Sequence, residues 1–200
     1  MPRLLYQGHA SFRIQTDRGA IAYIDPFAGE GYTYPADLVI VTHEHPDHNV
    51  VSLVTMKEGG RILRVDDLFK KGAYQTYEVA RMAIMAVPAT NEHHPVTEGV
   101  GILLDVDGIM LYFAGDTSYT NFMGKGLFGI DIDYAFLPID GVHNMGPEEA
   151  TFCADMIQPR WAVPIHMKPG QLFDREMAER FDYDNRLILE PGEEIGLAEW

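Results

Sequence analysis

The chain has 200 residues, 46% of them hydrophobic and 22% charged, which suffices for one sizeable core, so we expect a single domain over residues 1–200. Lysine and arginine number 15 against 30 acidic residues, and the net charge of −15 argues against nucleic acid or an anionic membrane surface as a partner. The lone cysteine, Cys153, and the lack of a signal-peptide pattern or a ~20-residue apolar run predict a cytoplasmic protein.

The first third of the chain is rich in short strand patterns. Strands are predicted over residues 4–7, 10–16, 20–25 and 37–42, and the last is a continuous apolar run typical of a strand buried on both faces. A histidine-rich turn follows it. Beyond that turn, Val50, Leu53 and Val54 have helical spacing, and Gly59 and Gly60 are expected to end this helix.

The middle of the chain again contains short strand patterns, and a helix is predicted among the later ones. Strands are predicted over residues 73–79, 81–87, 100–106, 109–114, 134–139 and 161–165. Pro147 and two following acids suit a helix start, an apolar stripe continues to Ile157, and Pro159 ends it. Layer rules therefore predict two sheets packed together with helices outside them.

Residues 42–48 read Thr-His-Glu-His-Pro-Asp-His and place four candidate metal ligands directly after a buried strand. Imidazole and carboxylate groups suit a borderline divalent ion such as zinc. Alternate residues of an extended segment point the same way, so His43 and His45 can hold one ion while Asp47 and His48 face a second. The alternative is a solvated histidine-rich loop, which its position behind a core strand disfavours.

Further candidate ligands lie where other predicted strands end. His166 closes the strand over residues 161–165, Asp116 follows the strand over residues 109–114, and His93-His94 lies in a loop after residues 81–87. Each alone has a structural alternative as a turn former or a surface residue. Because zinc sites draw ligands from several strand ends, we expect these residues to meet at one edge of the two sheets.

The pattern His-x-His-x-Asp-His, followed by a distal histidine, a Gly-Asp pair and a terminal histidine, resembles the metallo-β-lactamase superfamily. Segments such as Gly-His-Ala-Ser-Phe at residues 8–12 and Ile-Asp-Pro-Phe at residues 24–27 resemble its compact metal-dependent hydrolase branch, which includes ascorbate-6-phosphate lactonases. The resemblance implies an α+β fold, an αββα sandwich in which two mixed sheets pack face to face with helices on the outer faces.

Carried over residue by residue, the resemblance implies two metal sites. The first site takes His43, His45 and His94, the second takes Asp47, His48 and His166, and Asp116 bridges them; Asp47 and Asp116 are also the implied catalytic carboxylates. The doubled histidine departs from the branch pattern. Pro95 favours an extended conformation for His94, in which neighbouring side chains diverge, so only one of the pair is expected to be a ligand. The resemblance places the ligand directly before the proline and therefore implies His94.

Four other residues are expected to support the site. Asp25 ends a strand and is predicted to orient a ligand imidazole, with a plain turn carboxylate as its alternative. His9, Ser11 and His143 are candidates for substrate binding, and for His143, in a segment that departs from the branch pattern, a surface position is equally open.

The expected function is that of a metal-dependent hydrolase in which a metal-bound hydroxide cleaves an ester, lactone or phosphodiester of a small substrate, phosphorylated ones included. Two divalent ions are expected as cofactors, with zinc first and manganese or iron as alternatives. The other hypotheses are a nuclease of the same superfamily, which the charge disfavours, and a non-catalytic metal-binding protein. The oligomeric state is left open, a homo-oligomer included.

Overall fold

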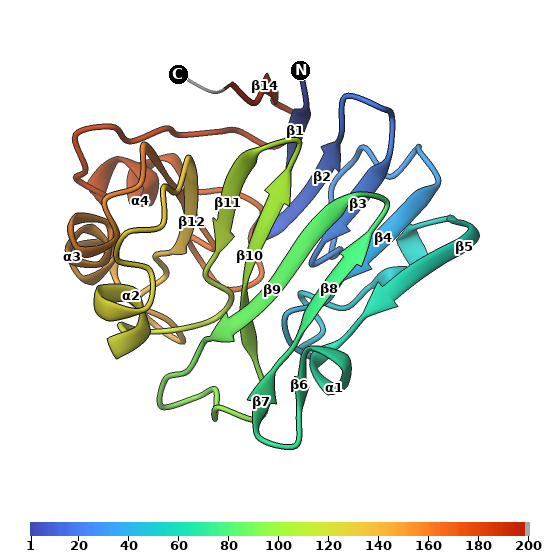
Figure 1. The fold of residues 1–200 in the computed structure, drawn as a ribbon. Coiled ribbons are helices and arrows are strands. Elements are labelled where there is room, and N and C mark those ends of the chain that lie inside the picture. Colours follow the sequence, from blue (N-terminus) through green and yellow to red (C-terminus); the bar gives the residue numbers. More distant parts are fainter. Residues whose placement is uncertain (199–200) are drawn as a thin grey trace.

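The computed structural model describes residues 1–198, and two six-stranded sheets form most of it (Figure 1). The first sheet has the strand order β14-β1-β2-β3-β4-β5 and mixes antiparallel and parallel pairs. Its strands are β1 (Arg3–Gly8), β2 (Ser11–Gln15), β3 (Ile21–Ile24), β4 (Ala36–Ile40), β5 (Met56–Leu63) and β14 (Glu194–Gly196). The expectation of one domain over residues 1–200 stays a prediction, and residues 199 and 200 lie outside the described residues.

The second sheet has the order β13-β12-β11-β10-β9-β8. Its strands are β8 (Thr76–Val79), β9 (Met82–Pro88), β10 (Val100–Val106), β11 (Ile109–Phe113), β12 (Tyr134–Pro138) and β13 (Trp161–Ile165). A small hairpin of β6 (Phe69–Lys70) and β7 (Ala73–Tyr74) follows the short helix α1 (Val65–Leu68) and leads into the second sheet. The chain thus builds the first sheet almost completely before it begins the second.

The main core lies between the two sheets. Leu38 and Ile40 of β4 face this core, whereas Val39 and the following Val41 face the opposite side of the first sheet, so the strand is buried on both faces as expected. From the second sheet, the stacked rings of Phe113 and Phe136, with centroids 4.5 Å apart, pack into the same core. The prediction of a two-sheet α+β sandwich is confirmed.

The outer faces of the two sheets are covered unequally. Three helices, α2 (Asn121–Lys125), α3 (Pro147–Ile157) and α4 (Arg175–Arg180), lie beside the second sheet (Figure 1). The apolar stripe of α3 packs on β12 and its neighbours, as its spacing predicts. The outer face of the first sheet is instead covered by the segment around the 3₁₀ turn Val51–Leu53. No helix within residues 1–198 has the length and apolarity that a membrane span requires.

Two predicted elements differ from the structure. The strand expected over residues 73–79 is divided into β7 and β8, which belong to different sheets, and a predicted helix is wrong. The expected helix from Val50 to Gly59 is only the 3₁₀ turn Val51–Leu53, and the glycines lie inside β5 rather than after a helix. Gly59 has a φ of +79°, and a Cβ on Gly60 would lie 2.8 Å from the carbonyl oxygen of Ala36. Pairing with β4, which shifts register in this region, therefore requires the glycines that otherwise read as a stop signal.

Within each sheet, strands that lead to candidate site residues run parallel to one another. β4 pairs parallel with β3, and β11, β12 and β13 form a parallel set in the second sheet. Because neighbouring parallel strands end at the same edge of a sheet, the loops after them gather there. The residues that follow β3, β4, β11, β12 and β13 include Asp25, His43, Asp116, Asp140 and His166, and the site is built from them.

Candidate metal centre

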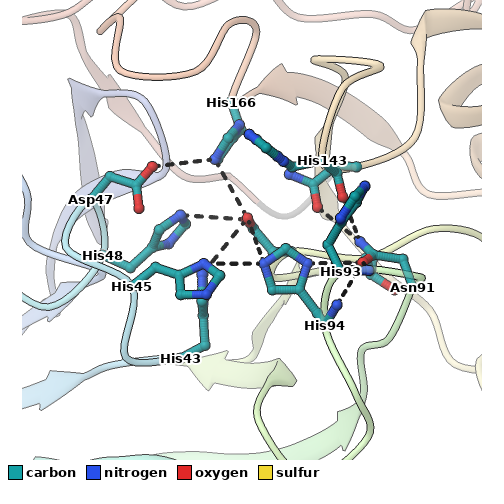
Figure 2. A network of polar contacts seen from close by, with 12 residues as sticks. His43, His45, Asp47, His48, Asn91, His93, His94, His143 and His166 are labelled. Atoms are coloured by element: carbon teal, nitrogen blue, oxygen red, sulfur yellow. Dashed lines mark hydrogen bonds and ion pairs between the residues drawn. The ribbon is translucent and has the colours of Figure 1, made fainter.

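The histidine-rich turn after β4 supplies the largest group of site residues. His43 pairs with Gly99 in an isolated antiparallel bridge, which ties this turn to the start of β10 in the other sheet. The chain then folds back, because the amide of His48 donates to the carbonyl of His45 at 3.0 Å. His43, His45, Asp47 and His48 consequently face a common centre (Figure 2).

Four more side chains reach this centre from separate loops. His94 comes from the loop after β9, Asp116 from the end of β11, His166 from the end of β13 and His9 from the turn between β1 and β2. Within each of two groups, one ligand atom per residue lies within 4.8 Å of all the others. The groups are His43, His45, His94 and Asp116, and His9, Asp47, His48 and His166. The structure thus brings together all seven residues expected as metal ligands and adds His9.

Asp116 belongs to the first group and also contacts residues of the second. Its Oδ2 is 3.7 Å from Nε2 of His43 and 3.5 Å from Nε2 of His94, both in the first group. The same carboxylate is 3.4 Å from Nε2 of His48 and 3.5 Å from Nε2 of His166, both in the second group. A carboxylate with contacts to both groups has the position that a bridging ligand requires.

These spacings and the unpaired nitrogens fit divalent ions. Ligand atoms about 2.1 Å from a tetrahedral ion lie roughly 3.4 Å from one another, whereas these distances are long for hydrogen bonds. Among the described residues, Nε2 of His43, His48 and His166 is buried without a hydrogen-bond partner. Buried polar groups are rarely left unpaired, so the donor set fits metal ions as the missing partners.

The other ring nitrogens of several candidate ligands have polar partners behind them. Nδ1 of His48 lies 3.0 Å from Oδ2 of Asp25, which also accepts hydrogen bonds from the hydroxyl and the amide of Thr42 through its two oxygens. Nδ1 of His94 lies 2.9 Å from Oδ1 of Asn91. Such contacts fix the ring orientation and leave Nε2 to face the centre. Asp25 lies where a residue that orients a ligand imidazole was expected.

His166 has an equivalent partner, Asp140, that the sequence analysis missed. Nδ1 of His166 lies 2.8 Å from Oδ2 of Asp140, and Oδ1 of Asp140 accepts hydrogen bonds from three successive amides of residues 142–144. Asp140 follows the buried strand β12 much as Asp116 follows β11. Its position shortly after a buried strand is the feature of the sequence that indicates Asp140 as a site residue.

Burial and charge act in opposite directions at the centre. Burial raises the pKa of Asp116, but His48 and His166 outweigh it and hold that pKa well below its usual range. Burial lowers the pKa of His43 to about 2. Burial also disfavours charge on His48, yet the carboxylates of Asp116 and Asp25 raise its pKa to about 9. The buried carboxylates thus favour positive charge at the centre, which divalent ions supply.

Three site residues adopt a left-handed backbone conformation. The φ angles are +58° for His9, +43° for Asp25 and +45° for His166. None of them is glycine, and this conformation costs a non-glycine residue on the order of 1–3 kcal/mol. The surrounding packing enforces it: the carbonyl of His9 accepts from the amide of His166 at 2.9 Å, which joins the ends of the two sheets.

The residues expected to bind substrate fall in different places. Ser11 is fully buried and its hydroxyl donates to the carbonyl of Asp25, which does not favour the expected contact with substrate; that role stays a prediction. His9 is also fully buried. Its Nε2 lies 3.2 Å from Oδ2 of Asp47 and its Nδ1 lies 3.1 Å from the carbonyl of Gln171, so its position does not favour the expected contact with substrate, which stays a prediction. His143 is exposed beside the centre.

The two histidines of the doubled pair lie in different surroundings, as expected. His94 is 2% exposed, and its Nε2 lies 3.2 Å from Nδ1 of His45 in the first group. His93 is exposed and lies outside both groups. Instead, its ring meets that of His143 edge to face, with centroids 5.4 Å apart. The choice of His94 as the ligand stays a prediction, and the geometry supports it.

Two cavities open at the centre and share His45 and His94 in their walls. The smaller, about 240 Å³, lies directly over the candidate ligands and reaches Asp116 and His166. The larger, about 410 Å³, lies on the other side of the shared histidines and is lined by carboxylates, Glu98 among them. The candidate ions would therefore be accessible to a small molecule.

Comparison with known proteins agrees with this geometry. The family described as a beta-lactamase superfamily domain matches residues 3–166. A UPF0173 metal-dependent hydrolase of Thermococcus kodakarensis is 30% identical over 98% of this chain and 100% of its own length. The solved structure of Igni18, a metallo hydrolase from Ignicoccus hospitalis, is 25% identical with a TM-score of 0.75 over 97% of each chain.

A further structure, the metallo-beta-lactamase fold protein YhfI of Bacillus subtilis, has a TM-score of 0.77 at 14% identity and covers 98% of this chain and 100% of its own. At that identity, the likeness concerns the fold alone. The closer relatives and the family match agree with the motif of residues 42–48 and with the two ligand groups. The chain therefore belongs to the beta-lactamase superfamily, among its metal-dependent hydrolases.

Proposed function

We propose that this chain hydrolyses an ester, lactone or phosphodiester bond of a small substrate and that it needs two divalent ions to do so. The observation that carries the proposal is the pair of ligand groups that share one buried carboxylate, Asp116. Zinc is expected first, and manganese and iron also suit a set of imidazoles and carboxylates. The small cavity over Asp116 fits a small substrate better than a polymer.

Each group has the residues to hold one ion. The first ion would take His43, His45 and His94, the second Asp47, His48 and His166, and Asp116 would contact both. Two bound divalent ions would supply a water of lowered pKa as the nucleophile and polarise the attacked oxygen.

The residues behind the ligands keep this arrangement in place. Asp25 and Asp140 face Nδ1 of His48 and His166, so each ring is held with Nε2 towards the centre. His9 lies against Asp47 and has its ring centroid 3.8 Å from that of His166, so it restrains both candidate ligands of the second ion. His9 is accordingly proposed as a positioning residue.

The proposal is tested by metal analysis joined to activity. The purified protein should contain about two zinc, manganese or iron ions per chain and should hydrolyse generic nitrophenyl esters or bis(4-nitrophenyl) phosphate. Removal of the ions by a chelator should abolish the activity, and addition of one metal at a time should restore it. The exposed-site variant Asp131→Asn serves as a control that should keep both properties. Full activity of protein shown to be free of metal would overturn the proposal.

A further inference from the structure

The small cavity over the metal centre has few groups left to contact a substrate. Nine residues line it, and five of them are candidate metal ligands. Pro46 and Pro169 contribute apolar surface. Among the described residues that line this cavity, His93 and His143 are therefore the side chains that offer polar atoms uncommitted to the ions (Figure 2).

These two histidines are held in place by the residues that orient the candidate ligands. Oδ1 of Asn91, which faces His94, also accepts from the amide of His93 at 2.8 Å. Oδ1 of Asp140, whose other oxygen faces His166, accepts from the amide of His143 at 2.7 Å. Each loop thus holds one ligand histidine and presents one free histidine to the cavity.

The two loops are also joined to each other. Nδ2 of Asn91 donates to the carbonyl of His143 at 2.8 Å and to Oδ1 of Asn144 at 3.2 Å. As a result the rings of His93 and His143 meet at the mouth of the cavity, with an interplanar angle of 86°. Donors that are held in advance in this way bind a ligand with little loss of conformational entropy.

The two cavities differ in the charge of the residues that line them. The larger cavity beyond His45 and His94 is lined by four carboxylates, Glu44, Asp66, Asp67 and Glu98, and its one guanidinium, Arg64, is paired with Glu44. An anionic group is repelled there. In the smaller cavity the lining carboxylates are ligands facing the proposed ions, so an anionic group meets imidazoles instead.

We propose that His93 and His143 form a binding subsite for an oxyanion of the substrate, a carboxylate or a phosphate group, next to the bond that is hydrolysed. This inference rests on the proposed function and narrows its substrate class. A neutral imidazole carries one N–H donor, so the subsite can donate two hydrogen bonds without either ring being charged. Hydrogen bonds to an ionised acceptor are the stronger kind.

The test compares hydrolysis of the acetyl ester in 4-acetoxybenzoate, which carries a carboxylate, and in its methyl ester, in which that carboxylate is neutralised by methylation, on metal-loaded protein. Wild type should favour the anionic ester. His93→Ala and His143→Ala should each raise KM for it about tenfold, which is ~1.4 kcal/mol, with the methyl ester changed less than about twofold. The glutamine variants at these two positions keep an amide donor, so they should raise KM for the anionic ester less than the alanine variants do.

Two further measurements separate loss of binding from loss of structure. The metal content of both alanine variants should equal that of wild type, and Glu92→Gln, an exposed neighbour of His93, should behave as wild type. Competitive inhibition by inorganic phosphate and by acetate shows which oxyanion the subsite prefers. The stronger inhibitor should lose about tenfold in affinity in each alanine variant.

In the alanine variants, an equal rise in KM for both esters would overturn the proposed subsite. An unchanged KM for the anionic ester with intact metal content would overturn it as well. Absence of metal-dependent hydrolysis in wild type is a different result, because it counts against the proposed function itself. In that case, calorimetric titration of metal-loaded protein with inorganic phosphate still tests the histidines. A dissociation constant that is the same in wild type and both alanine variants would overturn the inference.

Discussion

Asn144 connects the two halves of the candidate metal centre, and its removal should weaken metal binding far more than it weakens the fold. Its Nδ2 donates to Oδ2 of Asp140 at 2.8 Å, and its Oδ1 accepts from Asn91 at 3.2 Å. Burial raises the pKa of Asp116 and neighbouring imidazoles lower it, and a hydrogen bond from Asn144 lowers it further. The side-chain amide of Asn144 therefore restrains Asp140, Asn91 and Asp116. Asp140 faces His166, and Asn91 faces His94.

The structure sets the expected magnitudes for Asn144→Ala. Asp140 keeps its contacts with residues 142 and 143, and Asn91 keeps the carbonyl of His143, so neither is left without a partner. Loss of a few partly compensated hydrogen bonds should cost about 1–3 kcal/mol of unfolding free energy. Loss of a residue that supports metal ligands typically costs 10–100-fold in metal affinity, so we expect a fall of about that size.

The assay is competition for metal with a coloured chelator, followed by denaturant unfolding of the metal-free protein. Asn121→Ala, which changes an exposed asparagine at the start of α2, is the matched control and should leave both measurements unchanged. If Asn144→Ala bound both ions with wild-type affinity, the reasoning would fail. A variant whose metal affinity falls only in proportion to its loss of folded protein would likewise show a purely structural role for Asn144.

Three other predictions concern the ligands themselves. His45→Ala and His48→Ala should each lower hydrolysis below about a tenth of wild type while circular dichroism shows a folded chain, and activity above that level in both would contradict the assignment. Asp116→Asn should lower the metal content from about two ions to about one per chain, measured by elemental analysis. His94→Ala should lose metal whereas His93→Ala keeps it, and the reverse result would move the ligand by one position.

Much of the fold follows from local sequence patterns. The strands β10, β12 and β13 agree with prediction to within a residue, since each is a short apolar run bounded by turn residues or by a helix. Helix α3 follows from Pro147, two acids in the first turn and an apolar stripe. Patterns of this kind are visible without tertiary contacts.

Elements that depend on distant partners were not predictable in the same way. The strand β5 runs through Gly59 and Gly60 because it pairs with β4, and β14 exists because residues 194–196 pair with β1 almost two hundred residues earlier. Neither segment has a strong strand pattern of its own. In both, tertiary pairing outweighs the intrinsic preference of the residues.

The candidate ligands could be predicted from the sequence, whereas most of the contacts and backbone conformations that orient them could not. Position after a strand singled out His166 and Asp116, and the resemblance, which places a ligand directly before a proline, favoured His94 over His93. The left-handed backbone of His9 and His166, and the contact of Asp140 with His166, arise only when the strand ends meet. These are properties of packing, which no local pattern of residues reports.

Both ligand groups combine residues from the two sheets, and this has a consequence for folding. His43 and His45 follow β4 of the first sheet, but their group is completed by His94 and Asp116 from loops of the second. The second group likewise needs His166 from the end of β13. Neither sheet can assemble a group alone, so an ion bound by either group stabilises the packing of one sheet on the other. Metal affinity and resistance to unfolding are therefore linked through the same interface.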